Sequence, residues 1–341
     1  MRVGNFVGNT IEKAAVLPIS IPPRKKYLVY SLFTRGEGKG LRRWVVWQGH
    51  FPIDFWVASP YNIDNYASGP GPRQGGHTTM IFTVDIGNTT ITMGLYTPEG
   101  TLRFRGSIKT DKNKTRDQIA IDLLDMFHLY HADLQGITGA VVSSVVPPMT
   151  GAMADAIQQL SGVRPMIVGP GVKTGMNILA EVHNQLGADI VASSVAALQK
   201  YPQPIIVIDM GTATTLSYLG ESTYKGCAII PGVRIAVEAL SGRAAELPHI
   251  SLEEPPSIFG RSTIDAMRSG VLYGNAGMID SMIQRMEEAA KPVATVVMTG
   301  GNAALIQKYC KRQILIDENL LLDGLYYLYQ KNQDRRRKKS D

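Results

Sequence analysis

The chain has 341 residues, 44% of them hydrophobic and 19% charged, which is the composition of a water-soluble globular protein with room for two domains. No apolar stretch reaches the roughly 20 residues that a membrane-spanning helix needs. The two cysteines, Cys227 and Cys310, stand in no spacing typical of a disulfide framework or a zinc site. We therefore expect a cytoplasmic protein that does not enter a membrane.

The formal net charge of +6 comes from the two ends of the chain. Residues 1–79 carry ten Lys or Arg against four acidic residues, and residues 331–341 carry six against two. The stretch between them, residues 80–330, is therefore negative, with a net charge of −4. Residues 331–341 are expected to form a solvated basic tail, and no nucleic-acid partner is predicted for the acidic body.

Residues 1–79 differ from the rest of the chain, because Pro, Gly, basic and aromatic residues are mixed there without a helical or strand period. The region ends in the stretch GPGPRQGGH. We expect a non-homologous, disordered extension, which would arise if translation naturally begins at Met80. A genuine interaction segment is the alternative.

From Met80 onward the pattern becomes regular, and two stretches are nearly alike: IFTVDIGNTTIT at 81–92 and IIVIDMGTATTL at 205–216. Each is an apolar run that ends in Asp and Gly and then in small polar residues, which predicts a buried strand running into a tight hairpin. Such a turn suits a phosphate group, because glycine lets the backbone approach a ligand closely. Asp85 and Asp209 can hold the cation that accompanies the phosphate.

The two Asp-x-Gly turns lie 124 residues apart (209 minus 85), a spacing typical of a duplicated domain. We expect one domain over 80–201 and a second over 202–330, with a cleft between them. The run VATVVMTGGN at 293–302 is a third strand that opens into a glycine turn. Strands alternate with helices in between, including a helix predicted over 114–131, which indicates an α/β arrangement.

Residues 184–200 are predicted to be a loop that delivers Gly187, Ala188 and Asp189 to the start of a helix. An Asp at this place can simply cap the helix, because the amino-terminal end of a helix is positive. It can also serve as a catalytic carboxylate. No P-loop motif of the type GxxxxGK[ST] occurs, so P-loop chemistry is not expected.

The motifs DIGNT, GAD, DMGTATT, IIPGV, GRST and SGVLYGNAGMID follow one another between residues 80 and 330. In this order they resemble the type III pantothenate kinase family, within the actin-like ATPase and sugar kinase superfamily. The resemblance implies duplicated ribonuclease H-like α/β domains with a cleft between them. It also implies ATP-dependent phosphorylation of pantothenate to 4′-phosphopantothenate, the first step of coenzyme A synthesis, by a homodimer.

The same resemblance implies roles for individual residues. Asp189 would accept the proton of the attacking hydroxyl, Asp209 would bind a monovalent cation, K⁺ or NH₄⁺, and Asp85 would bind a divalent cation such as Mg²⁺. The contacts with ATP would come from Asp85, Ile86, Gly87, Asn88, Thr89, Thr90, Ile91, Thr92 and Thr212. The contacts with pantothenate would come from Gly187, Ala188, Asp189, Ile190 and Thr263.

The sequence departs from the family pattern at two substrate positions. Ile190 stands where the family usually has an Arg that contacts pantothenate, and Ala180 stands where it commonly has a Tyr. Losing such an Arg can cost on the order of 2 kcal/mol of substrate binding. Two alternatives therefore stay open: a kinase of the same fold for another small hydroxy acid, and a non-catalytic paralogue. A replacement for the missing Arg could come from Arg234, Arg243, Arg261 or Arg268.

Overall fold

The computed structural model describes the backbone of residues 28–35, 41–48, 58–61, 79–179, 186–244 and 246–337, and side chains within these ranges from residue 79 to residue 333. Ala180 lies outside the described residues. The chain divides into two compact units, residues 1–76 and 77–341.

The first unit contains a three-stranded antiparallel sheet in the order β1-β2-β3. Its strands are β1 (Leu28–Arg35), β2 (Leu41–Gln48) and β3 (Ala58–Tyr61). The sequence pattern predicted no strand here, because apolar and polar residues do not alternate along these segments. The origin of residues 1–79 as an upstream extension stays a prediction.

The second unit consists of two lobes, and the first lobe is built on a sheet in the order β6-β5-β4-β7-β8. Three antiparallel strands come first in the chain, and two parallel strands are added after helical crossovers. The strands are β4 (Met80–Ile86), β5 (Thr90–Tyr96), β6 (Leu102–Lys109), β7 (Ile137–Ser144) and β8 (Met166–Ile167). The helices are α2 (Arg116–Leu129), the short η1 (Leu134–Gly136) and α3 (Pro147–Ser161).

The second lobe repeats this plan on a sheet in the order β14-β13-β10-β11-β12-β9. When the five shared strands of each lobe are numbered along the chain, both sheets read 3-2-1-4-5, and β9 is an added edge strand. The strands are β9 (Asn177–Ile178), β10 (Ile205–Met210), β11 (Ala213–Gly220), β12 (Thr223–Pro231), β13 (Thr295–Thr299) and β14 (Leu315–Ile316). The helices are α5 (Val233–Arg243), α6 (Thr263–Ala289) and α7 (Ala303–Gln307). The predicted duplication of ribonuclease H-like α/β domains is confirmed.

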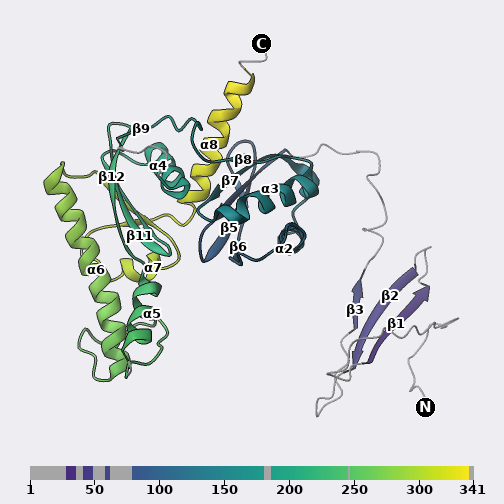
Figure 1. Ribbon diagram of the computed structural model, residues 1–341, viewed down its shortest axis with the longest axis horizontal. Helices are drawn as coiled ribbons and strands as arrows, with labels where there is room; N and C mark the ends of the chain where they lie inside the picture. Colours follow the sequence, from purple (N-terminus) through teal and green to yellow (C-terminus); the bar gives the residue numbers. More distant parts are fainter. Residues whose placement is uncertain are drawn as a thin grey trace. The chain divides into compact units, whose positions relative to one another are not determined.

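Two further helices, α4 (Ala188–Lys200) and α8 (Leu320–Arg337), lie between the two sheets (Figure 1). Their buried side chains belong to one core cluster with residues of both sheets, such as Ile81 of β4 and Val207 of β10. The outer faces of the sheets are covered separately, by α2 and α3 in the first lobe and by α5, α6 and α7 in the second. The lobes are therefore held together through a shared helical layer.

The helix predicted over 114–131 is confirmed as α2, with Ile119, Leu123 and Phe127 buried against the first sheet. Its start is fixed by Thr115, which forms a capping box with Gln118. Among the residues that the structure describes, no helix is both long and apolar enough to cross a lipid bilayer.

The carboxyl-terminal segment differs from the predicted tail. Helix α8 continues from Leu320 to Arg337, and the side chain of Asn332 bonds to the backbone N–H and C=O of Lys173. The helix also contacts β4, β5 and β7 of the first lobe. The predicted second domain, residues 202–330, therefore includes a helix that packs on the first lobe, and the last turns of this helix take up part of the predicted tail.

We predict that Gly300→Ala destabilises the fold by about 3 kcal/mol or more. Gly300 follows β13 with φ of +97°, and a Cβ there would stand 2.7 Å from the backbone of Met210. Gly301→Ala is the matched control, because a Cβ at Gly301 would have no neighbour within 4 Å. Denaturant unfolding of both variants checks this, and equal stabilities would contradict the proposed close approach.

Candidate functional site

Strand alternation directs Asp85 and Asp209 toward the layer of α4 and α8. In β4 the side chains of Phe82, Val84 and Ile86 pack against α2 and α3, so the alternate position of Asp85 faces the opposite side. In β10 Asp209 shares its face with residues that pack on α4. Each lobe therefore contributes one carboxylate to the space between the lobes.

The third carboxylate, Asp189, lies in the first turn of α4. Its Oδ1 accepts a hydrogen bond from the backbone N–H of Ile190 at 2.8 Å, which satisfies one free N–H of the first turn, although the N-cap residue is Gly187. Gly187 precedes the helix, and a Cβ there would stand 2.3 Å from Asp189 Oδ1. Glycine at this position therefore leaves room for the carboxylate.

The two hairpin turns contact each other. The hydroxyl oxygens of Thr89 and Thr212, one from each turn, are 2.9 Å apart and share a hydrogen bond. A Cβ on Gly87 would stand 3.0 Å from the carbonyl oxygen of Thr90, and a Cβ on Gly232 would stand 2.2 Å from that of Thr212. The glycines thus let the turns close tightly, and exposed hydroxyl and amide groups are left facing solvent.

Burial and mutual repulsion disfavour the charged forms of these carboxylates. Burial raises the pKa of Asp85 to about 8, with Asp189 and Asp209 adding to the shift and the nearby Ser143 hydroxyl opposing it. Burial also raises the pKa of Asp209 to about 7, again with a contribution from Asp189. The pKa of Asp189 is raised by burial and held down by backbone N–H groups. The three carboxylates therefore interact electrostatically, which indicates that they belong to one site.

The unpaired oxygens of the site are suited to cations. Among the described residues the buried atoms Asp85 Oδ1 and Ser143 Oγ have no hydrogen-bond partner of good geometry, although the two residues lie opposite each other on β4 and β7 and the Ser143 hydroxyl is near enough to lower the pKa of Asp85. Within the described residues no group of three or more His, Cys, Asp or Glu side chains could hold a metal ion alone. A divalent ion here would share its coordination with phosphate oxygens, which is how Mg²⁺ commonly binds.

Sequence reasoning missed several residues of the first turn. Lys112 donates from its Nζ to Asn88 Oδ1 at 3.2 Å, which brings a positive charge to the turn. The Thr110 hydroxyl donates to the carbonyl oxygen of Gly87 at 2.7 Å and so helps to fix the conformation of the turn. Ser143 lies opposite Asp85, as Thr299 lies opposite Asp209 in the second lobe. Only the duplicated strand order could have located these two hydroxyl residues from the sequence.

Some of the expected contact residues lie elsewhere. The side chains of Ile86 and Ile91 pack in the core of the first lobe, so only their backbone atoms are left to contact a ligand. Ile190 is only 9% exposed and packs in the core cluster between the lobes. Thr263 is exposed at the start of α6, and among the described residues no hydrogen bond joins it to Asp189.

A family model and a curated relative both match the chain to type III pantothenate kinases. The family model described as type III pantothenate kinase matches residues 81–285. A type III pantothenate kinase of Bacillus cytotoxicus is 42% identical over 257 residues, which cover 74% of this chain and 97% of that protein.

Two solved structures share low sequence identity with the chain. The activator of the 2-hydroxyisocaproyl-CoA dehydratase from Clostridium difficile with bound ADPNP is 12% identical, with a TM-score of 0.49, over 76% of this chain and 98% of that one. An inorganic polyphosphate/ATP-glucomannokinase from Arthrobacter is 13% identical, with a TM-score of 0.41, over 74% and 98%.

We predict that Asp85→Asn stabilises the ligand-free protein at pH 9 in EDTA by at least about 1 kcal/mol. Because the pKa of Asp85 is higher in the folded state, its contribution to stability is largest at low pH and is lost as the pH rises through about 8. The gain from Asn should therefore shrink on going from pH 9 to pH 5.

Calorimetric unfolding at both pH values checks this. Asp117→Asn, at an exposed residue in the first turn of α2, is the matched control and should leave the pH dependence unchanged. A melting temperature of Asp85→Asn no higher than that of the parent at pH 9 would contradict the electrostatic account.

Proposed function

The chain belongs to the type III pantothenate kinase family, and we propose that it transfers the γ-phosphate of ATP to the primary hydroxyl of pantothenate. The observation that supports the proposal is that Asp85, Asp189 and Asp209 are near enough to interact. The charge of Asp189 raises the pKa values of both Asp85 and Asp209, and the charge of Asp209 also raises that of Asp85. The product would be 4′-phosphopantothenate, the first intermediate of coenzyme A synthesis.

Asp189 is proposed as the proton acceptor. The hydroxyl oxygen of pantothenate attacks the γ-phosphorus, the bond to the β-phosphate oxygen breaks, and the hydroxyl proton passes to the Asp189 carboxylate. Because the transition state of phosphoryl transfer is loose, alignment matters more than strong basicity. A pKa raised by burial brings this carboxylate nearer to the operating pH, which suits a general base.

The two hairpin turns are proposed to bind the phosphates of ATP. Backbone N–H groups of the tight turns and the one hydroxyl of the Thr89–Thr212 pair that does not donate to the other can serve as donors, and Lys112 adds a positive charge beside Asn88. Asp85 would hold a divalent ion such as Mg²⁺, and Asp209 would hold K⁺ or NH₄⁺. Such cations would offset the charge of the triphosphate and would favour the ionised forms of Asp85 and Asp209.

The carboxylate of pantothenate needs a positive partner, and the structure reduces the four candidate arginines to three. Arg268 donates to Ser251 and to Glu253 at 2.7 Å, so it is already paired. Arg234, Arg243 and Arg261 make no hydrogen bond or ion pair with the described residues and are exposed. The burial of Ile190 keeps the alternative acceptor, another small hydroxy acid, as the second candidate function.

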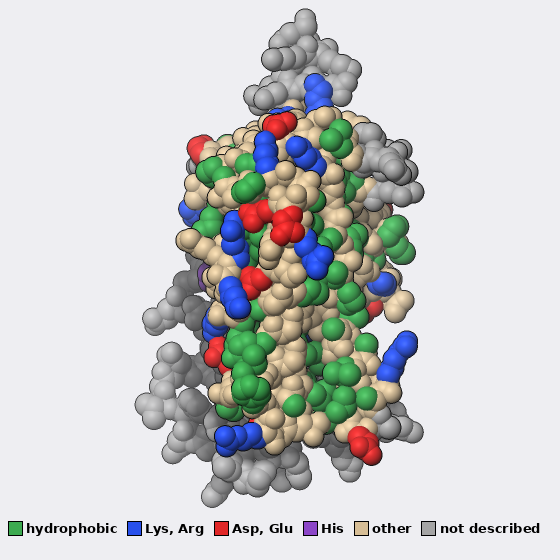
Figure 2. Space-filling view, turned by 90° about the vertical axis from the view of Figure 1, so that its left-hand side faces the viewer, with side chains coloured by type: hydrophobic (Ala, Val, Ile, Leu, Met, Phe, Trp, Pro, Cys, Tyr) green, Lys and Arg blue, Asp and Glu red, His purple; other side chains and the backbone are tan. Residues whose placement is uncertain are grey.

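A homodimer is part of the proposal and is supported by an exposed apolar surface. Figure 2 shows hydrophobic side chains gathered on the lower half of the face along which α6 runs. Exposed hydrophobic residues on α5, before α6 and at its start are Ile235, Leu240, Ile258, Phe259 and Ile264. Phe259 is 81% exposed, and such a surface is typical of a protein interface. A second copy placed here could also bring Thr263 toward a substrate. We further propose that the enzyme works in the cytoplasm and binds no nucleic acid.

We predict that Asp189→Asn lowers kcat for pantothenate phosphorylation by about 100-fold or more, because the amide cannot accept the hydroxyl proton. The KM for ATP should change little, since the hairpin turns are untouched. A coupled assay of ADP release with K⁺ and Mg²⁺ measures both constants, and Asp117→Asn serves as the control.

The same assay over a panel of small hydroxy acids tests the acceptor. An unaltered rate in Asp189→Asn would refute the role of the base. A rate on pantothenate no higher than on the other acceptors would refute the proposed substrate.

A further inference from the structure

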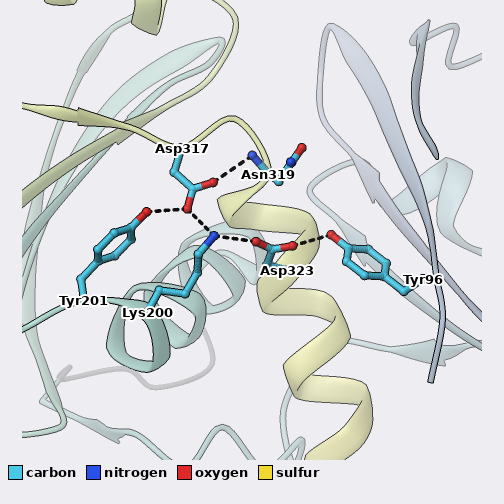
Figure 3. A network of polar contacts seen from close by, with 6 residues as sticks. All are labelled: Tyr96, Lys200, Tyr201, Asp317, Asn319 and Asp323. Carbon is cyan, nitrogen blue, oxygen red and sulfur yellow. Dashed lines mark hydrogen bonds and ion pairs between the residues drawn. The ribbon is translucent and has the colours of Figure 1, made fainter. Parts of the chain in front are cut away.

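A buried polar network surrounds the carboxyl-terminal end of α4, and Figure 3 shows its members. Lys200 Nζ donates to Asp317 Oδ2 at 2.5 Å and to Asp323 Oδ2 at 2.7 Å. The hydroxyl of Tyr201 donates to Asp317 at 2.7 Å, and that of Tyr96 donates to Asp323 at 2.6 Å. One ammonium group is therefore shared by two carboxylates, each of which is fixed by a tyrosine.

The network connects α4 with both lobes. Asp317 directly follows β14 of the second lobe, whereas Asp323 belongs to α8, which packs on the first sheet. Tyr96 is the last residue of β5 in the first lobe. Lys200 therefore links its helix to the second lobe through one ion pair and to the first lobe through the other.

These ion pairs are partly shielded from water, so removing one partner leaves the other charge poorly solvated. The side chains of Asp317 and Asp323 are only 9% and 19% exposed, and that of Lys200 is 27% exposed. Burial alone lowers the pKa of Lys200, but the bonds with both carboxylates outweigh it and hold the pKa above its usual value. Loss of this cation would leave two partly buried carboxylates without a counter-charge.

We propose that Lys200 is a positioning residue for the phosphoryl transfer, because its two ion pairs fix α4 between the lobes and thereby fix Asp189 at the other end of the helix. The two residues are separated by about 16 Å along the helix axis, at about 1.5 Å per residue. A displacement of a reacting group by about 1 Å can cost about 100-fold in rate. The inference rests on the proposed role of Asp189.

The test compares Lys200→Met with two matched tyrosine variants. Tyr96→Phe and Tyr201→Phe each remove one hydrogen bond to a carboxylate of the network and leave both ion pairs of Lys200 in place. The measurements are kcat, the KM for ATP, and amide hydrogen exchange of residues 191–194. Val191 donates to the Gly187 carbonyl at 3.0 Å, so these amides report on the end of α4 that carries Asp189.

In the folded Lys200→Met variant we expect kcat to fall about tenfold or more, with the KM for ATP changed less than about threefold. Exchange of residues 191–194 should become faster, although these residues lie far from position 200. Both tyrosine variants should keep kcat within about threefold of the parent. A folded Lys200→Met variant with parental kcat, or equal losses of kcat in the tyrosine variants, would overturn the proposal.

If Lys200→Met does not fold, the charge-balanced variant Lys200→Met/Asp323→Asn is judged by the same criteria. If the parent itself does not phosphorylate pantothenate, the proposed function fails, and hydrogen exchange decides the positioning role alone. Faster exchange at residues 191–194 in Lys200→Met, but not in the tyrosine variants, would support that role. Unchanged exchange would overturn it.

Discussion

The proposed site depends on burying three carboxylates between the two lobes, against the preference of each charge for water. Burial raises the pKa of Asp85, Asp189 and Asp209, and the charge of Asp189 adds to the shift in the other two. Buried carboxylates of this kind keep their positions only where rigid strands and helices hold them. Two strand ends and one helix start provide the carboxylates, and all three elements are anchored in the same hydrophobic cluster.

Duplication of one sheet plan explains how the site is assembled. Each lobe places an Asp at the end of its first strand and a hydroxyl residue opposite it on the fourth, Ser143 in one lobe and Thr299 in the other. Each lobe is followed along the chain by a helix, α4 or α8, that enters the common middle layer. The first turn of α4 then completes the site with a residue that belongs to neither sheet.

The sequence was sufficient for the local features of this arrangement. The Asp-x-Gly turns at Asp85 and Asp209 and the helix that begins beside Asp189 were predicted, because each follows from a short pattern of apolar and polar residues. The link between Tyr96 and Asp323 was not, since it joins residues far apart in the chain whose proximity depends on the packing of α8. The buried side chain of Ile190 was expected to line the substrate pocket, because position in a motif does not reveal which side of the helix faces the core.

The most direct test of the central claim counts protons released when MgATP binds. At pH 7 a carboxylate with a pKa of about 8 is mostly protonated and one with a pKa of about 7 is about half protonated, so both must lose protons to hold cations. Titration calorimetry at pH 7 in buffers of different ionisation enthalpy should therefore show net proton release, and Asp85→Asn should reduce it. Binding of MgATP with no proton release, and no difference between parent and variant, would contradict the account.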